Sequence, residues 1–269
     1  MHVPGQDRLC SYHRAGLGEP FILPPELVVP DEAPGEQVNR LCRLVHRCSH
    51  NGYRLANHSY DVMTLSARLA RFVGFDLGQI QVVRIGGFLH DVGKVFTCLD
   101  TLLSPKHGLG DAEWLEVMRH PAEGAALVTH PELGAVRTLI GCHHEWPGNR
   151  GPDAGGFSYP EGLSHTEIAA VARGGHAIYG RRGYPNQLRR GELPEEVLLL
   201  SVCDWYAGCA ERRLYREAQV HDVAMRWTEE AAALGKIDPQ FTMTLGRMLA
   251  ERPWHPCTAA VEPAAAVVP

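Results

Sequence analysis

Residues 87–94 read Gly-Phe-Leu-His-Asp-Val-Gly-Lys, so an apolar stretch runs directly into the adjacent pair His90 and Asp91. We expect this stretch to be the end of a helix, stopped by Gly93 in the left-handed conformation that glycine adopts easily. On a regular helix, adjacent side chains point about 100° apart and rarely share a ligand. At a helix end, both side chains can aim at one metal ion, and a carboxylate can bridge two ions. Taken alone, however, such a dipeptide is more often a chance pair.

Further histidines and one further acid occur where helices are expected to begin, to break or to be buried. His120 precedes a proline, which places it near a break, and His143 and His144 form a second adjacent pair close to a proline. His58 lies near the start of a predicted helix. Asp204 lies within a very apolar helical stretch, where an unpaired acid is costly to bury. Each lone histidine is more often a core or surface residue, and Asp204 could instead form a salt bridge to a nearby arginine.

Taken together, these histidines and acids are a more specific signal of a metal site than any one of them alone. The set consists of His58, His90, Asp91, His120, His143, His144 and Asp204. Five imidazoles and two carboxylates are enough to hold two metal ions and to leave positions open for water and substrate. Such ligands without thiolates suit Fe, Mn, Zn or Co rather than a structural zinc site. The eight cysteines form no Cys-x-x-Cys pair, and most lie among apolar residues, so we expect them to be free thiols.

The apolar pattern around this set is helical. Leu41, Leu44, Val45 and Cys48 are spaced as i, i+3, i+4 and i+7 along one helix face. Similar spacings or helix-start signals occur at residues 63–72, 111–118, 194–196 and 238–249. No convincing alternating strand pattern is visible, so we predict an all-α fold.

Length and composition fit one large globular domain with appendages: 269 residues, 45% of them hydrophobic and 21% charged. The net charge of −5 argues against binding to DNA or RNA duplexes, because proteins that bind polyanions are usually basic. No apolar run reaches the length of about 18 residues that a membrane span needs. The N-terminus lacks the pattern of a signal peptide, so we expect a cytoplasmic protein.

From about His58 to Arg216 the chain resembles the HD superfamily of metal-dependent phosphohydrolases, and specifically its HD-GYP branch. Besides His58, the matching motifs are His90-Asp91-Val92-Gly93-Lys94, Met118-Arg119-His120-Pro121-Ala122-Glu123-Gly124, His143-His144-Glu145, Gly183-Tyr184-Pro185, Gly191-Glu192-Leu193-Pro194, Asp204-Trp205-Tyr206 and Arg213-Leu214-Tyr215-Arg216. Of the two Tyr-Pro pairs, the one at Tyr184 rather than Tyr159 has the spacing to Asp204 that fits the family. We therefore place a Gly/Pro-rich insertion at about residues 147–180.

The resemblance implies an HD-domain helical bundle with this long loop insertion. We predict a Pro/Gly-rich N-terminal arm at 1–40, an HD-GYP-like catalytic domain at 41–250 and a Pro/Ala-rich flexible tail at 251–269. The implied activity is hydrolysis of cyclic di-GMP, or of a close cyclic dinucleotide, to the linear dinucleotide and often onward to GMP. The implied cofactors are two divalent metal ions, for which Fe or Mn fit best and Zn or Co also fit.

The resemblance also assigns roles to individual residues. One metal ion would be held by His58, His90, Asp91 and Asp204, and the other by Asp91, His120, His143 and His144. Asp91 and Lys94 would be the catalytic residues. Lys94, Arg213 and Arg216 would bind phosphate, and Tyr184 would lie near the substrate. Without the metal set, Arg213 and Arg216 would fit an ordinary solvated basic face equally well.

The chain departs from the family pattern at three places. Arg54 stands where members with three metal ions have Glu, which argues against a third ion; residues 180–182 replace the usual Asp-Gly-x, and Ala207 replaces an Asp. Three hypotheses therefore stay open. The chain is a two-metal phosphodiesterase for a cyclic dinucleotide, a phosphohydrolase for another nucleotide, or a non-catalytic module that binds a dinucleotide or docks to a partner such as a cyclase-domain protein.

Overall fold

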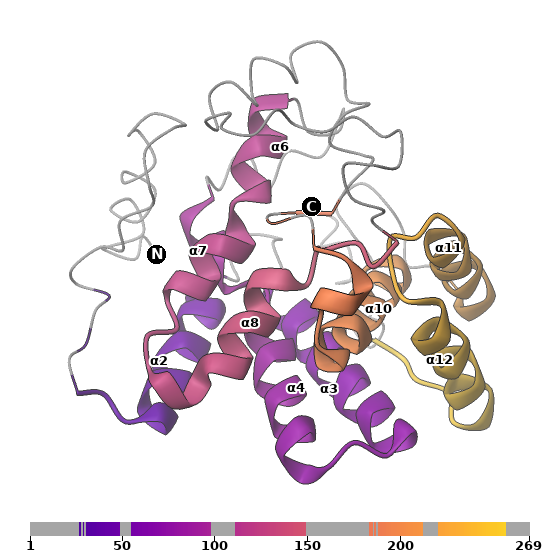
Figure 1. Ribbon diagram of the computed structural model, residues 1–269, viewed down its shortest axis with the longest axis horizontal. Helices are drawn as coiled ribbons and strands as arrows, with labels where there is room; N and C mark the ends of the chain where they lie inside the picture. Colours follow the sequence, from indigo (N-terminus) through magenta and orange to yellow (C-terminus); the bar gives the residue numbers. More distant parts are fainter. Residues whose placement is uncertain are drawn as a thin grey trace, which may run out of the picture.

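The computed structural model describes residues 27, 29, 31–48, 55–97, 111–148, 183, 184, 186, 188–211 and 220–256. In these ranges the chain forms helices and turns and no strand, so the all-α prediction is confirmed (Figure 1). The elements are α2 (Pro34–Arg47), α3 (Leu55–Val73), α4 (Leu77–Leu89), the 3-10 helix η3 (Val92–Phe96), α6 (Asp111–Met118), α7 (His120–Ala126), η4 (Pro131–Leu133), α8 (Gly134–Cys142), η6 (Arg190–Glu192), α10 (Glu195–Ala210), α11 (His221–Ala233) and α12 (Pro239–Glu251).

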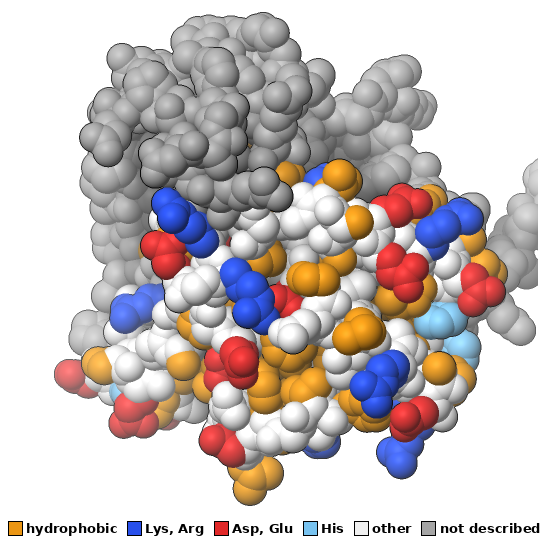
Figure 2. Space-filling model, turned by 45° about the vertical axis from the view of Figure 1, so that its right-hand side comes forward, with side chains coloured by type: hydrophobic (Ala, Val, Ile, Leu, Met, Phe, Trp, Pro, Cys, Tyr) orange, Lys and Arg blue, Asp and Glu red, His pale blue; other side chains and the backbone are white. Residues whose placement is uncertain are grey.

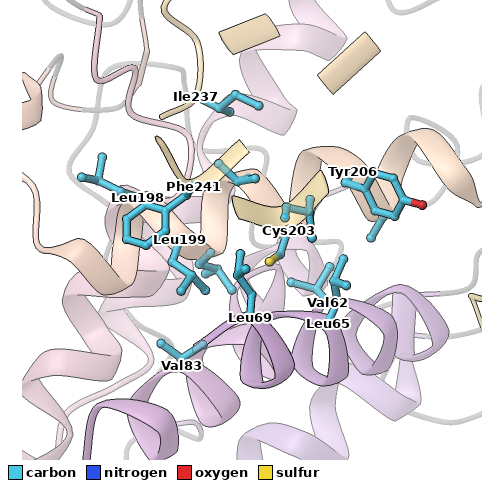
Figure 3. Close-up of a cluster of buried hydrophobic side chains, with 14 of the residues drawn as sticks. Val62, Leu65, Leu69, Val83, Leu198, Leu199, Cys203, Tyr206, Ile237 and Phe241 are labelled. Atoms are coloured by element: carbon cyan, nitrogen blue, oxygen red, sulfur yellow. The ribbon is translucent and has the colours of Figure 1, made fainter. Parts of the chain in front are cut away.

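Helix α10 is the centre of the larger hydrophobic core. It contacts α3, α4, α8, α11 and α12, and it buries apolar side chains on every side, as a fully enclosed helix must. Figure 3 shows Leu199 and Cys203 of α10 lying over Leu65 and Leu69 of α3, all of which are fully buried. The apolar run that surrounds Asp204 in the sequence is therefore a core helix, and it carries that acid into the middle of the molecule.

A second core lies under α2. Leu41 and Val45 of this helix are fully buried, as their spacing predicts, and they belong to one cluster with Leu89, Phe96 and Ile140. Helix α2 begins at Pro34, so the predicted boundary between arm and domain at residue 40 falls inside a helix. Both cores include side chains of α4 and α8, and the pairs His90-Asp91 and His143-His144 directly follow these two helices.

The helix ends explain how the motifs are positioned. The Asp238 side chain accepts hydrogen bonds from the backbone N–H groups of Gln240 and Phe241 at the start of α12, which confirms the helix start predicted there. Pro194 directly precedes the first residue of α10, as its sequence signal predicted. Helix α4 ends at Leu89, directly before the His-Asp pair.

The prediction that Gly93 adopts a left-handed conformation is wrong. Among the described glycines only Gly74 and Gly235 have a positive φ, and Gly93 lies inside the right-handed 3-10 helix η3. Glycine is needed there because of a close approach of two backbones. A Cβ atom at this position would lie 2.0 Å from the carbonyl oxygen of His120, which begins α7. Gly93 thus lets η3, and with it Asp91, pack directly against α7.

Several predicted features lie outside the described residues. They include the insertion from residue 149 onward, most of the N-terminal arm, the tail from residue 257, Arg54, Tyr159, residues 180–182, Arg213 and Arg216. Within the part of the chain that the structure describes, no helix is long and apolar enough to cross a membrane. On the face shown in Figure 2, acidic and basic side chains alternate with apolar ones over the described residues.

Candidate metal centre

Five segments that are distant in sequence bring the seven predicted ligands together. They are α3, the end of α4 with the start of η3, the start of α7, the residues after α8, and the middle of α10. The side chains form two groups, and within each group the candidate ligand atoms lie within 4.8 Å of one another. The first group is His58, His90 and Asp204, and the second group is Asp91, His120, His143 and His144. The convergence of all seven residues is what their order in the sequence predicted.

The Asp91 carboxylate lies between the two groups. Its Oδ2 atom is 3.4 Å from Nε2 of His90 and 3.9 Å from Nε2 of His58, both in the first group. Its Oδ1 atom is 3.0 Å from Nε2 of His120 and 3.9 Å from Nε2 of His143, both in the second group. Each oxygen therefore faces a different set of imidazoles, which is the geometry of a carboxylate that can bridge two cations.

Three of the histidines are oriented in the same way by backbone carbonyls. The Nδ1–H of His90 donates to the carbonyl of Gly87 at 2.9 Å. His120 and His143 donate likewise to the carbonyls three residues before them, at 2.6 and 2.7 Å. Because Nδ1 carries the proton, Nε2 of each neutral ring presents a lone pair to the centre of the site. The backbone thus fixes the tautomer that binds metal ions.

Asp204 and a residue that the sequence reasoning missed orient His58. Nε2 of His58 lies 3.0 Å from Oδ1 of Asp204, and its Nδ1 lies 3.1 Å from Oε2 of Glu211. Asp204 therefore pairs with His58 and His90, while the arginines at 212, 213 and 216 lie outside the described residues. Glu211 directly follows α10 and is seven residues after Asp204, which puts both acids on one side of that helix. This spacing is the signal that could have identified Glu211.

Carboxylates make the first group basic. Burial alone would lower the pKa of His58, but Glu211 and Asp204 raise it to about 9. In the same way, Asp91 and Asp204 raise the pKa of His90 to about 10 against the effect of burial. Both rings are therefore protonated at neutral pH while no cation is bound, and a cation that enters this group takes the place of their protons.

The second group has the opposite character. Burial lowers the pKa of His144 to about 3, with a further contribution from His120. Burial and the neighbouring imidazoles also hold the pKa of His143 well below its usual value. The pKa of His120 is lowered by burial, although Asp91 opposes this. These three rings are neutral at physiological pH, which is the form that coordinates a metal ion.

A divalent cation fits the two groups. Nε2 of His120 faces Nε2 of His143 at 3.1 Å, so two neutral rings held as donors at Nδ1 direct their lone pairs at each other. Among the described residues, the buried atoms Nε2 of His90 and Oδ1 of Asp91 have no hydrogen-bond partner. Facing lone pairs and unpartnered buried polar atoms are unfavourable unless a cation satisfies them. The donor set of imidazoles and carboxylates suits Fe, Mn, Zn or Co.

Lys94 and Tyr184 lie at the edge of the groups. The Lys94 ammonium donates to Oδ2 of Asp91 at 2.5 Å. Burial alone would raise the pKa of the Asp91 carboxyl, but Lys94 and His90 hold it well below its usual range. The ring of Tyr184 lies against His144, with 4.8 Å between ring centroids and 30° between the planes. The structure therefore brings both residues to the site, as predicted, whereas Arg213 and Arg216 lie outside the described residues.

The chain is similar in sequence to known proteins. The model of the HD domain family matches residues 55–209. A 3'3'-cGAMP-specific phosphodiesterase 1 from Vibrio cholerae is 24% identical over 183 residues, which cover 68% of this chain and 35% of that protein. A cyclic di-GMP phosphodiesterase from Thermotoga maritima is 30% identical over 186 residues, which cover 64% of this chain and 47% of that protein. The chain thus spans about a third to a half of the length of these relatives.

Two solved structures share the fold. The HD domain of the Listeria monocytogenes phosphodiesterase PgpH, in complex with cyclic-di-AMP, has a TM-score of 0.50 at 12% identity, over 80% of this chain and 93% of that one. An HDG"Y"P protein from Bdellovibrio bacteriovorus has a TM-score of 0.50 at 18% identity, over 81% of this chain and 61% of that one. Since the family model covers more than half of the chain, the chain belongs to the HD domain family.

Proposed function

We propose that this HD-domain chain is a two-metal phosphodiesterase that opens a cyclic dinucleotide, with cyclic di-GMP as the expected substrate. The relatives named as cyclic di-GMP and cGAMP phosphodiesterases and the neighbour in complex with cyclic-di-AMP support a cyclic dinucleotide as the substrate class. The Gly183-Tyr184-Pro185 motif and the position of Tyr184 on His144 support the HD-GYP branch. The expected product is the linear dinucleotide, and further cleavage would release GMP.

The observation that carries the proposal is the position of Asp91. Its two carboxylate oxygens face different histidine groups, so the first and second groups would each hold one ion and share this carboxylate. Fe or Mn are the expected metals, and Zn or Co fit the same donors. Two divalent ions held by these residues would supply charge that polarises a phosphodiester and lowers the pKa of water near it.

The chain's own residues complete the chemistry. Lys94 is hydrogen-bonded to Asp91 and keeps 19% of its side chain exposed, so its ammonium can reach a phosphate bound over the metal centre. A fixed cation there stabilises the negative charge that grows on the phosphate oxygens in the transition state. Tyr184 adds an aromatic ring and a phenol beside His144, where part of a nucleotide would lie. Arg213 and Arg216 are proposed as further phosphate ligands.

The test is a metal and activity measurement on anaerobically purified protein. We expect about two Fe or Mn ions per chain by mass spectrometry and conversion of cyclic di-GMP to linear product or GMP by chromatography. His90→Ala and Asp91→Ala should lose both metal and activity, whereas His46→Ala, at an exposed histidine at the end of α2, should keep both. Full activity in either site variant would contradict the proposal.

A substrate panel separates the three hypotheses. Two ions with turnover of cGAMP or cyclic di-AMP but not of cyclic di-GMP would keep the reaction and change the base preference. Turnover of mononucleotides alone would indicate a phosphohydrolase of another kind. Tight dinucleotide binding by metal-loaded protein without any turnover would indicate a binding module and overturn the enzymatic proposal.

A further inference from the structure

Glu145 is a buried carboxylate that the seven candidate ligands do not include. Its residue is 1% exposed, and it directly follows His144 after the end of α8. Oε1 accepts a hydrogen bond from the backbone N–H of Asn186 at 2.5 Å, and Oε2 accepts one from the N–H of Leu188 at 2.8 Å. Burial of a carboxylate is costly unless its oxygens are satisfied, and here both oxygens bind the backbone of one distant segment.

The neighbours of Glu145 hold the same segment. The backbone N–H of Tyr184 donates to the carbonyl of His144 at 3.1 Å, and the Tyr184 ring lies against the His144 ring. Gly183 packs so closely that a Cβ atom there would lie 2.1 Å from the backbone N of Trp146. We call this contact of residues 144–146 with residues 183, 184, 186 and 188 the clasp.

The clasp ties Tyr184 to the metal centre. The His144 ring lies between Tyr184 and His143, with a centroid distance of 4.2 Å to the latter. A displacement of the backbone at Asn186 and Leu188 would therefore move Tyr184 away from His144. The ring nitrogens of His143 and His120 would stay in place, because these two rings are held by carbonyls of other segments.

We propose that Glu145 is a positioning residue, whose carboxylate holds Tyr184 on His144 and thereby sets the affinity of the site for its nucleotide. The claim that Glu145 affects nucleotide binding rests on the proposed function. The claim that Glu145 holds the segment with Tyr184 rests on the hydrogen bonds alone. We therefore predict that loss of the Glu145 carboxylate weakens substrate binding while both metal ions are kept.

The test compares Glu145→Gln with Glu192→Gln. The amide of Glu145→Gln keeps the shape of the side chain but offers one oxygen, so one of the two N–H groups faces an NH2 group instead. Glu192 is a matched control, because Oε2 of this exposed side chain accepts the N–H of Arg189 at 2.9 Å, next to the clasp but, among the described residues, with no hydrogen bond to residues 144–146. Gly183→Ala opens the clasp from the other side and leaves Glu145 intact.

Three measurements on metal-loaded protein decide the matter. Hydrogen exchange of the amides of Tyr184, Asn186 and Leu188 should be at least about tenfold faster in Glu145→Gln and Gly183→Ala than in the wild type and Glu192→Gln. Metal content should be equal in all four proteins. KM for cyclic di-GMP should rise about tenfold or more in the two clasp variants, with kcat within about threefold of the wild type.

Unchanged hydrogen-exchange rates in Glu145→Gln and Gly183→Ala would overturn the claim that Glu145 holds the segment with Tyr184. Faster exchange with an unchanged KM, or a loss of metal in parallel with activity, would overturn the role in substrate positioning. If the wild type neither binds nor hydrolyses a cyclic dinucleotide, the proposed function fails and the substrate role of Glu145 falls with it, while the exchange rates still decide whether Glu145 holds the segment.

Discussion

Replacement of Gly93 by alanine should disrupt the metal centre through the backbone. An ideal Cβ atom at this position would lie 2.0 Å from the carbonyl oxygen of His120 and 2.6 Å from the amide nitrogen of Gly124. Real Cβ contacts essentially never fall below 3.0 Å. Both obstructing atoms belong to the backbone of α7, so they cannot move aside as a flexible side chain would. The 3-10 helix η3 and α7 must therefore shift apart by about 1 Å to bring the shortest contact from 2.0 to 3.0 Å.

The expected cost follows from overpacking. Extra methylene groups in a packed interior lower the free energy of unfolding by about 1–3 kcal/mol. Because the Cβ atom of Gly93→Ala would meet only backbone atoms, we expect a cost at the upper end, about 3 kcal/mol. The separation also moves Asp91 away from His120, whose Nε2 atom lies 3.0 Å from Oδ1 of that carboxylate. We therefore expect a lower free energy of unfolding in urea and loss of the ion from the second group.

Gly134→Ala is the matched control. Gly134 begins α8, and a Cβ atom there would meet no atom within 4 Å. Alanine at such a position should be neutral or stabilising by up to about 1 kcal/mol, because it restricts the unfolded chain. A Gly93→Ala variant with the metal content of the wild type and a free energy of unfolding within about 1 kcal/mol of it would refute the close-approach argument.

Three further predictions follow from the site and its surroundings. Glu211→Gln removes the carboxylate that orients His58 and should weaken metal binding about 10- to 100-fold in a chelator competition, whereas equal affinity would contradict the role of Glu211. In the metal-free chain the pKa values of His58 and His90 are raised to about 9 and 10, so protonation of these rings stabilises the fold. This contribution is complete below pH about 6.5 and is lost as the pH rises through 9–10, so the free energy of unfolding in urea should decline across that range. Metal binding at pH 7 should displace these protons, and calorimetry in two buffers with different ionisation enthalpies should detect their release. Lys236→Met removes an ammonium that lies 5.1 and 5.5 Å from the centroids of two tryptophan rings and should cost about 1 kcal/mol in urea unfolding, with no change in metal content.

The sequence was sufficient to select the residues that the fold brings together in the two candidate groups, because each of them coincides with a local signal. His120 and His143 lie just after helix ends close to a proline, and Asp204 is an acid in an apolar helix, so chemistry and local structure agree at those positions. Gly93 shows the limit of such reasoning. A glycine after a helix predicts a left-handed turn, but its actual constraint comes from α7, which contacts it only in the folded chain.

The supporting carboxylates were harder to predict for the same reason. Glu211 and Glu145 act on partners that are distant in sequence: His58 for the first, and the backbone of Asn186 and Leu188 for the second. A single sequence gives no pairing between such positions. Only the spacing of seven residues between Asp204 and Glu211 offered a hint, and it becomes meaningful once α10 is known to be one unbroken helix.

The position of the histidines at helix ends has a common physical cause. The last four carbonyls of a helix have no partner within it, so they are free to accept hydrogen bonds. His90, His120 and His143 follow the last residues of α4, α6 and α8 by one or two positions, and each donates Nδ1–H to a carbonyl in the last turn of that helix. One hydrogen bond thus satisfies a free carbonyl, fixes the tautomer and directs Nε2 inward. A histidine in mid-helix would find the same carbonyl already occupied, so an imidazole ligand of this kind belongs where a helix stops.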